Sequence, residues 1–429
     1  MITHELIERI EGEARIDFQC DRHGGVEDAI IRFEHFRGME RVLEGRDPLD
    51  ALVITPRVCG ICGHSHLMAA VRALESGLRN AGVCVELSSK AVALRALTLA
   101  SELLQNHIKW VYLVLGYQCA KMEGKGAISP LRGLEIASKA NTLSALFSGQ
   151  WPHSSYALPG GVTCDPTRLE IIHAHRLLDE IERFAHTQLW NGEVEHFGCE
   201  DLSLYSGDVG TMIGVLERLE LSNKGIAHGR YLVAGEDGFS ASGWYEKGER
   251  RCVDSALIQE DDRHTFMRGG KTYAKNALYD GEFCETGPLA RAIVSNRSGI
   301  ENLIRDYGEG VLSRVGARLG EIGVLIREIR HRLDTIDLAE PSYISPQRAG
   351  SYEGIGIVEA PRGSLIHKVR VREGKIERYE IITPTQWNLG IGSAATPSVA
   401  QQAMRGSQSI SHAELIFRTF DVCSVCTTH

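Results

Sequence analysis

Two C-x-x-C pairs at opposite ends of the chain are the feature that most constrains its fold. Cys59 and Cys62 lie in Arg57-Val-Cys-Gly-Ile-Cys-Gly-His-Ser-His66, and Cys423 and Cys426 lie close to the C-terminal His429. Soft thiolates of this kind select zinc, copper(I), iron–sulfur or nickel and iron centres. If both pairs serve one site, the fold must join segments that are roughly 360 residues apart, whereas ordinary zinc modules are local.

Two simpler uses of these cysteines follow from the residues alone. A structural four-cysteine zinc site could tie the two ends of the chain together. A thiol–disulfide redox role is disfavoured, because no thioredoxin-like βαβ pattern surrounds either pair. The remaining cysteines show no framework spacing, so the sequence predicts a reduced chain and not a disulfide scaffold. They are Cys20, Cys84, Cys119, Cys164, Cys199, Cys252 and Cys284.

The composition is that of a globular protein with a sizeable core. The chain has 429 residues, of which 43% are hydrophobic and 24% charged. A net charge of −9 disfavours a broad surface for nucleic acid or anionic membrane. Residues 1–9 lack an apolar signal core, and no run of about eighteen apolar residues occurs. We therefore expect no membrane span and a cytoplasmic chain, or one that is exported or membrane-associated only through a partner.

The periodicity of apolar residues predicts a mainly helical fold with small β additions, of the α+β class. Residues 13–20 and 28–35 read as a strand pair, and residues 365–382 as a hairpin. Long apolar helices usually pack into a central bundle, which leaves the sheets at the periphery. A 3.6-residue period predicts helices over 66–81, 88–116, 166–190, 288–336 and 397–404.

We expect one large catalytic domain over residues 1–429, because no repeat or linker divides the chain. Residues 192–282 are rich in Gly, Asp and Glu, which indicates an irregular or mixed insertion. The predicted regions are 1–58 (β-rich), 59–190 (helical bundle), 191–285 (insertion), 286–340 (helical bundle) and 341–429 (hairpin and metal-binding segment).

The first cysteine pair is followed directly by a predicted helix. A helix N-terminus lowers the pKa of a thiol, so Cys62 is placed to be a thiolate. His66 lies four residues later and therefore on the same side of that helix. Its imidazole is suited to donate a hydrogen bond to a sulfur or to a metal ligand.

The two cysteine segments resemble the R-x-C-G-x-C-x-x-x-H and D-P-C-x-x-C-x-x-H signatures of the nickel–iron hydrogenase large subunit. Val422 replaces the usual Pro, and Ile391-Gly392-Ser393 replaces the usual Pro-Arg-Asp, which makes the alignment at the latter segment uncertain. Each further match is weak alone, but together they follow the family's order along nearly the whole chain. They are Arg9-Ile-Glu-Gly12, Phe36-Arg-Gly-Met-Glu40, Pro152-His153 with Pro159-Gly-Gly-Val162, Gly287-Pro-Leu-Ala-Arg291, Glu359-Ala-Pro-Arg-Gly363 and Thr385-Gln-Trp-Asn388.

This resemblance implies reversible heterolytic cleavage of molecular hydrogen at a nickel–iron centre. Cys59 and Cys423 would be terminal nickel ligands, and Cys62 and Cys426 would bridge nickel and iron. The iron would carry two cyanides and one carbon monoxide. A metal-bound thiolate such as Cys423 keeps a lone pair and could take the proton.

The resemblance also implies helper residues around the metals. Arg362, after Pro361, would lie over the metals and bond a cyanide nitrogen or act as a base. Thr385, after Pro384, would donate its hydroxyl to the other cyanide, and Glu11 would accept the proton beyond the sulfur. Without the surrounding motifs these residues would read as an ion-pairing arginine, a turn threonine and a surface glutamate.

A second metal ion, magnesium or iron, is implied near the C-terminus. Its ligands would be Glu40, His429 and the backbone carbonyl of Ala394. An end at His429 fits either a chain whose extension was cleaved after metal insertion or a subgroup made without one. His107, on the long predicted helix, could line a gas or proton route, but a hydrogen-bonded core histidine is the favoured reading.

Partners and rival functions complete the prediction. The chain has no spare cysteine cluster, so electrons would leave through an iron–sulfur small subunit in an obligate heterodimer or a larger assembly. Maturation proteins would insert the metals, and no nucleic acid would bind. The quinone-binding subunit of respiratory complex I has a similar fold but lacks the four cysteines, which disfavours it. A hydrogen sensor of the same family, with low turnover, shares the motifs and stays open.

Overall fold

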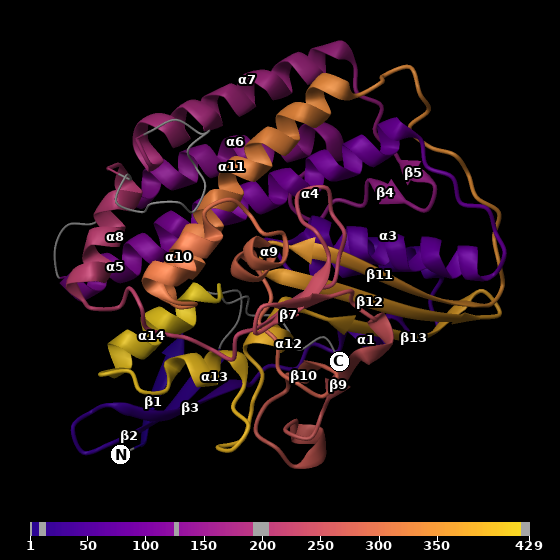
Figure 1. Ribbon diagram of the computed structural model, residues 1–429. Coiled ribbons are helices and arrows are strands. Elements are labelled where there is room, and N and C mark those ends of the chain that lie inside the picture. The colour runs from indigo at the N-terminus through magenta and orange to yellow at the C-terminus, as the bar shows by residue number, and fades with distance from the viewer. Residues whose placement is uncertain (1, 8–13, 124–127, 192–205, 422–429) are drawn as a thin grey trace.

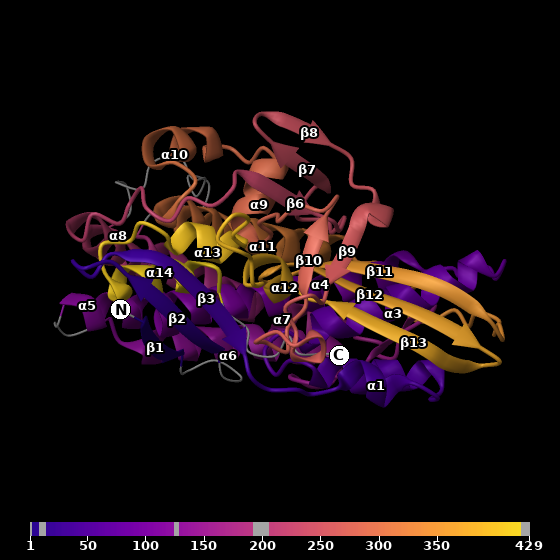
Figure 2. The same ribbon diagram turned by 90° about the horizontal axis from the view of Figure 1, so that it is seen from below.

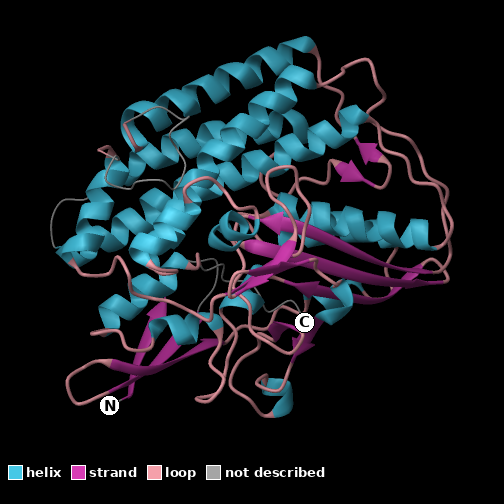
Figure 3. Ribbon diagram, viewed as in Figure 1, coloured by secondary structure: helices cyan, strands magenta, loops and turns pink. Residues whose placement is uncertain are grey.

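A computed structural model describes residues 2–7, 14–123, 128–191 and 206–421. Long helices form one half of the molecule, and a three-stranded sheet with smaller β elements forms the other (Figures 1 and 3). The bundle consists of α4 (Ser89–Lys109), α6 (Pro130–Ser148), α7 (Arg168–Phe184) and α11 (Val311–Thr335). The predicted central bundle with peripheral sheets is therefore what the structure has.

The helix boundaries follow from local chemistry. Ser88 caps α4 by accepting a hydrogen bond from the Ala91 N–H, and Thr167 with Glu170 forms a capping box for α7. Helix α4 continues through a π-helical segment, Trp110–Leu115, into α5 (Gly116–Glu123). The predicted helix 88–116 is thus confirmed and is longer than expected.

Two helix predictions needed correction. The sequence reading missed α6 altogether. The single helix predicted over 288–336 is in fact three helices, α9 (Pro288–Val294), α10 (Ile300–Tyr307) and α11. The breaks fall at Gly299 and Gly308, which have φ angles of 78° and 68° that other residues rarely adopt.

The main sheet lies against the helix that follows the first cysteine pair. Antiparallel strands β11 (Tyr352–Ala360), β12 (Gly363–Arg372) and β13 (Lys375–Ile382) form it, so the predicted hairpin lacked its first strand. Strand β11 packs directly on α3 (Gly63–Asn80) (Figures 1 and 2). A Cβ on Gly356 would lie only 2.0 Å from the Ala69 carbonyl oxygen, so glycine permits this close approach.

The smaller elements surround this frame. The predicted N-terminal strand pair is present as β2 (Ala14–Cys20) and β3 (Val26–Phe33), and β1 (Ile2–Ile7) adds a third strand. The described part of the insertion is mixed, as predicted, whereas residues 192–205 lie outside the described ranges. It contains α8 (Asp208–Arg218), β6 (Arg230–Val233), β7 (Gly243–Glu246), β8 (Glu249–Arg251), β9 (Ile258–Asp261) and β10 (Asn276–Tyr279).

Short helices and one small hairpin complete the described chain. They are α1 (Met39–Leu43), α2 (Ala51–Ile54), α12 (Pro384–Asn388), α13 (Val399–Met404), α14 (Ile410–Thr419), β4 (Ala157–Leu158) and β5 (Gly161–Val162). One large cluster of buried apolar side chains runs from Ala14 to Phe420. Among the described residues, no helix has the length and apolar character needed to span a bilayer.

Candidate metal centre

The first cysteine pair occupies a buried loop before α3. Cys62 is the residue that precedes the helix, as predicted, and Cys59 and Cys62 have exposed fractions of only 1% and 6%. Their sulfur atoms lie 2.6 Å apart, and the Cys62 N–H donates to the Cys59 Sγ at 3.2 Å. Two thiols that converge in a dry loop at a helix N-terminus are suited to bind a soft metal as thiolates.

Two neighbouring segments hold this loop by its carbonyl groups. The Arg37 Nη1 donates to the Val58 carbonyl at 2.6 Å. On the other side, the Ile61 carbonyl accepts from the Gln105 Nε2 at 3.1 Å and the Asn106 Nδ2 at 2.7 Å. The cysteine loop is therefore fixed to α4 by side chains that the sequence reading did not single out.

Glu102 anchors the start of α3. Its carboxylate oxygens accept from the His64 N–H at 2.8 Å, the Ser65 N–H at 2.9 Å and the Ser65 hydroxyl at 2.6 Å. Two backbone donors that the helix leaves unpaired are satisfied in this way. Burial raises the pKa of Glu102 to about 7. A carboxyl group from α4 thus sets where the helix behind Cys62 begins.

Arg362 lies close to this loop. It sits in the turn between β11 and β12 with 5% of its surface exposed. Its Nη2 lies 3.4 Å from the Asn106 Oδ1, and its Nε lies 3.5 Å from the Asp421 Oδ1. Asn106 therefore touches both the cysteine loop and Arg362, and Asp421 brings the chain next to Arg362 just before the second cysteine pair.

His66 belongs to a chain of three buried rings. Its Nδ1 lies 3.1 Å from the His367 Nε2, and the His367 Nδ1 lies 2.9 Å from the Tyr379 hydroxyl. Burial holds the pKa of His367 well below its usual value, so this imidazole is neutral. The imidazole of His66 is thus oriented from the side of the sheet.

Pro384 and Thr385 form the first turn of α12 and are buried. Asn388 of the same helix exchanges hydrogen bonds of 3.0 Å with the backbone of Thr286. The Thr286 hydroxyl in turn accepts from the Ser364 N–H at 2.8 Å, two residues after Arg362. Thr286 thus contacts both the turn that carries Arg362 and the helix that carries Thr385. The two candidate cofactor-binding segments therefore lie on either side of Thr286.

Glu40 and Ala394 lie in different surroundings. Glu40 is buried, and its Oε1 accepts from the Ile381 N–H at 2.8 Å. Burial raises the pKa of this carboxyl to about 7. Ala394 is exposed, and its carbonyl accepts from the Arg405 Nη1 at 3.1 Å. Ile381, which the sequence reading did not name, is the backbone position that touches Glu40.

Several predicted residues cannot be placed. Glu11, Cys423, Cys426 and His429 lie outside the described residues. Within the described ranges, no group of three His, Cys, Asp or Glu side chains converges as a metal site.

His107 is a fully hydrogen-bonded core histidine, as the sequence favoured. Its Nδ1 accepts from Arg318 and its Nε2 contacts Glu321, and the ring is completely buried. Burial lowers the pKa of His107 to about 4, so the ring is neutral near pH 7.

The residues missed around the loop carried a signal in the sequence. Glu102, Gln105 and Asn106 are three and four positions apart, so they share one face of α4. Polar side chains on one face of an otherwise apolar buried helix need partners, which marks that face as the wall of a polar site.

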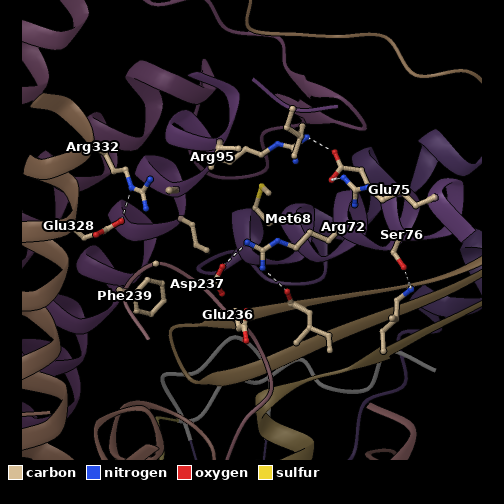
Figure 4. A pocket seen from close by; sticks show the side chains of 18 residues that line it. Met68, Arg72, Glu75, Ser76, Arg95, Glu236, Asp237, Phe239, Glu328 and Arg332 are labelled. Carbon is tan, nitrogen blue, oxygen red and sulfur yellow. Dashed lines mark hydrogen bonds and ion pairs between the residues drawn. The ribbon is translucent and has the colours of Figure 1, made fainter. Parts of the chain in front are cut away.

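The largest cavity described is separate from the cysteine loop. It has a volume of about 530 Å³ and lies between α3, α4 and β11, with Met68 and Phe239 among its apolar lining (Figure 4). Its polar wall is made of ion pairs, Arg72–Asp237 at 2.6 Å, Arg95–Glu75 at 2.8 Å and Arg332–Glu328 at 2.7 Å. Because these guanidinium groups are already matched by carboxylates, the wall offers no excess charge for an ionic ligand.

Comparison with known proteins identifies the family. The model of the nickel-dependent hydrogenase family matches residues 37–117 and 237–429. The chain belongs to this family. The predicted function is thereby confirmed: the chain is the large, catalytic subunit of a hydrogenase, an oxidoreductase that acts on molecular hydrogen. Nothing in the comparisons favours the hydrogen-sensing alternative.

Curated relatives match the hydrogenase over nearly its whole length. The periplasmic [NiFeSe] hydrogenase large subunit of Desulfomicrobium baculatum is 25% identical over 462 residues, covering 90% of this chain and 85% of that protein. The sulfhydrogenase 2 subunit alpha of Pyrococcus furiosus is 27% identical, covering 98% and 97%. The coenzyme F420 hydrogenase subunit alpha of Methanothermobacter thermautotrophicus is 26% identical, covering 98% and 93%.

Solved structures confirm the predicted fold. The Ni-Fe-Se hydrogenase of D. vulgaris Hildenborough in the reduced state superposes with a TM-score of 0.85 at 24% identity, covering 100% of both chains. The H2-activated [NiFeSe]-hydrogenase of Dm. baculatum gives a TM-score of 0.84 at 23% identity, again over 100% of both chains. The mainly helical architecture with small sheets is thus the fold of hydrogenase large subunits.

Proposed function

We propose that the four paired cysteines hold a nickel–iron centre in this hydrogenase. Cys59 and Cys423 would be terminal nickel ligands, and Cys62 and Cys426 would bridge the two metals. One observation carries this proposal: Asn106 joins the loop of the first pair to Arg362, and Arg362 contacts Asp421, which leads into the second pair. The two buried, converging sulfur atoms of the first pair fit soft-metal ligation.

The surroundings also fit the cyanide and carbonyl ligands that we propose on the iron. Such a centre, when bound, supplies the Lewis acidity and redox chemistry that splitting hydrogen requires. Arg362 keeps its charge at any physiological pH, so its N–H groups can bond an anionic cyanide nitrogen. Thr385, beside Pro384, offers a hydroxyl and His66 an imidazole N–H. Their burial excludes water, which strengthens each of these bonds.

The proton leaves through this chain's own groups. The Cys423 thiolate would accept it first, and Glu11 would receive it next. A carboxyl group suits this second role when partial burial brings its pKa toward neutrality. Arg362 would act by orienting the ligands of the iron and by its charge.

We propose a magnesium or iron ion at Glu40 and His429. Glu40 is a buried carboxyl close to those of Glu260 and Glu380, and a group of carboxyls suits a hard cation. Strand β13 is an edge of its sheet, and the Ile381 N–H points outward to Glu40. Because the N–H and C=O of one strand residue point the same way, the Ile381 carbonyl faces Glu40 too. It is better placed than the exposed Ala394 carbonyl to complete this site.

A small-subunit partner follows from the relatives, which are named as large subunits. We propose that it carries iron–sulfur clusters and forms an obligate heterodimer, or a larger assembly, with this chain. Apart from Cys59 and Cys62, no two cysteines in the described part of the chain have C-x-x-C spacing. Residues 1–429 would act as one catalytic unit, with metals inserted by maturation proteins and cellular location set by the partner.

Metal analysis with infrared spectroscopy on the purified assembly tests this proposal. Nickel and iron in equal amounts, with cyanide and carbonyl stretching bands, are expected. Zinc alone would overturn the assignment. Cys59→Ser and Cys423→Ser should each abolish hydrogen oxidation, whereas Cys84→Ser, at an exposed thiol, should keep it. Full turnover in either ligand variant would refute the nickel-ligand roles.

A further inference from the structure

A buried chain of polar contacts leads away from the Arg362 guanidinium. The Asp421 carboxylate contacts Arg362 through Oδ1 and accepts from the Arg318 Nη1 at 2.8 Å through Oδ2. The same Nη1 lies 3.1 Å from the His107 Nδ1. Arg318 is almost fully buried, and its guanidinium stacks over the Trp110 ring at 4.5 Å. Arg318 therefore joins the side of Arg362 to the C-terminal end of α4.

The series of polar contacts continues from His107 to the Glu321 carboxylate on α11. The His107 Nε2 lies 2.9 Å from the Glu321 Oε1. Glu321 also accepts from the Arg291 Nε at 2.9 Å and from the Arg297 Nη1 at 2.8 Å. Glu321 and His107 are both completely buried. Glu321 is thus the point where contacts from α4, α9 and the segment after α9 meet.

Arg291 connects this series of contacts back to the backbone beside Arg362. Its guanidinium donates to the carbonyl of Ala360 at 3.0 Å and to the carbonyl of Pro361 at 3.3 Å. These are the two residues that precede Arg362. The contacts therefore form a closed ring that holds Arg362 through its side chain at one end and through its backbone at the other.

This ring combines charged and neutral groups. Although burial opposes it, the charges of Arg291 and Arg297 hold the pKa of Glu321 well below its usual value. Glu321 is therefore ionised and pairs with both guanidinium groups, whereas His107 is neutral. His107 joins Glu321 to Arg318 without adding a charge.

The ring holds Arg362 by its side chain and by the backbone that precedes it, in a buried place. We propose that Glu321, together with His107 and Arg291, positions Arg362 for hydrogen cleavage. This inference rests on the proposed function, because it presupposes that Arg362 faces the metals.

The ring differs from the buried ion pair of Arg95 and Glu75 on the wall of the cavity (Figure 4). These two side chains pair with each other and with neighbouring backbone groups, and Glu75 also lies 3.9 Å from the Arg79 Nη2. Buried ion pairs add little net stability, so stability alone does not explain a ring that closes on one functional arginine. Glu75→Gln is therefore a matched control for Glu321→Gln, since both remove the charge of a buried carboxylate paired with arginine.

The test compares Glu321→Gln, His107→Phe and Glu75→Gln in the assembled enzyme with its partner. His107→Phe breaks the ring without changing its charge, which keeps the test informative if Glu321→Gln fails to fold. Nickel and iron content, the cyanide stretching bands, kcat and the KM for hydrogen are measured. Both ring variants should retain the metals and lose kcat by roughly 100-fold, because displacement of a positioned group by about 1 Å has an effect of this size.

The outcomes separate positioning from general destabilisation. The ring variants should shift the cyanide bands and leave KM unchanged, and Glu75→Gln should do neither. Wild-type kcat and unshifted bands in His107→Phe would overturn the proposal. Equal losses in all three variants would also overturn it, since they would show a stability effect. If the wild-type enzyme lacks nickel, iron and cyanide bands, the proposed function itself has failed. The wild-type measurement therefore distinguishes failure of the proposed function from failure of the positioning role.

Discussion

The His66 Nδ1 lies 3.1 Å from the His367 Nε2, so one of these nitrogen atoms carries a proton and the other accepts it. The hydroxyl of Tyr379 determines which of the two nitrogen atoms carries the proton. Its hydroxyl contacts the His367 Nδ1, and burial raises the pKa of Tyr379, so the phenol keeps its proton. No second acceptor for this hydroxyl occurs among the described residues. Tyr379 therefore donates to His367, His367 donates to His66, and the proton of His66 is left on Nε2.

Tyr379→Phe removes the group that sets this order. We expect the metals to be retained and the cyanide and carbonyl bands to shift. Turnover should fall by roughly 10-fold, as is usual when a hydrogen-bonding group that surrounds a metal site is lost. Tyr112→Phe is the control, because Tyr112 is also buried but donates to Asp208 at 2.8 Å. Unchanged bands and turnover in Tyr379→Phe would contradict the ordered chain.

Glu102→Leu tests the anchoring of the first cysteine pair. The backbone N–H groups of His64 and Ser65 would lose their acceptor in a buried place, which should lower the free energy of unfolding by roughly 2–4 kcal/mol. Nickel content should fall as well, because these groups start the helix behind Cys62. Thr167→Ala, at the exposed cap of α7, should cost about 1 kcal/mol and keep the nickel. Chemical denaturation and metal analysis measure both effects, and full nickel content in Glu102→Leu would count against this role.

Gly356→Ala tests the contact between β11 and α3. The added Cβ would lie 2.0 Å from the Ala69 carbonyl oxygen, so the helix or the strand must move. Overpacking of this kind costs about 1–3 kcal/mol, and a displaced α3 should also reduce metal incorporation. Gly350→Ala is the control, since a Cβ there meets nothing within 4 Å. Equal melting temperatures and metal contents in the two variants would show that α3 tolerates the shift.

Glu359→Gln tests a predicted pH dependence of stability. Burial raises the pKa of Glu359 to about 7, whereas an unfolded carboxyl titrates near about 4.3. Between these values the native state binds more protons than the unfolded state, so this group's contribution to stability falls as pH rises and is constant above about pH 7. The variant lacks this contribution. Its melting temperature relative to wild type should therefore rise from about pH 5 to about pH 7.5; parallel curves would refute the assignment.

The sequence predicted those elements that present one apolar face. Residues 88–116, 166–190 and 365–382 have clear periods, and each corresponds to helix or strand in the structure. The missed α6 packs between α4 and α7 and is therefore contacted from two sides. Its buried face includes the small residues Gly133, Ala137, Ala140 and Ser144, whereas Leu131 and Leu134 are exposed, so its apolar period is weak. The three-way division of 288–336 depended on the φ angles of individual glycines, which periodicity does not report.

The sequence by itself identified the family and the cysteine pairs that we propose as metal ligands, because ordered motifs need no structure to be read and a C-x-x-C pair lies within one loop. Only the tertiary structure decided what surrounds Arg362. His107, Arg291, Arg318 and Glu321 come from helices far apart in the chain, and each alone reads as an ordinary core or surface residue. Their contacts exist because α4, α9 and α11 pack together, and long-range packing leaves no local pattern in the sequence.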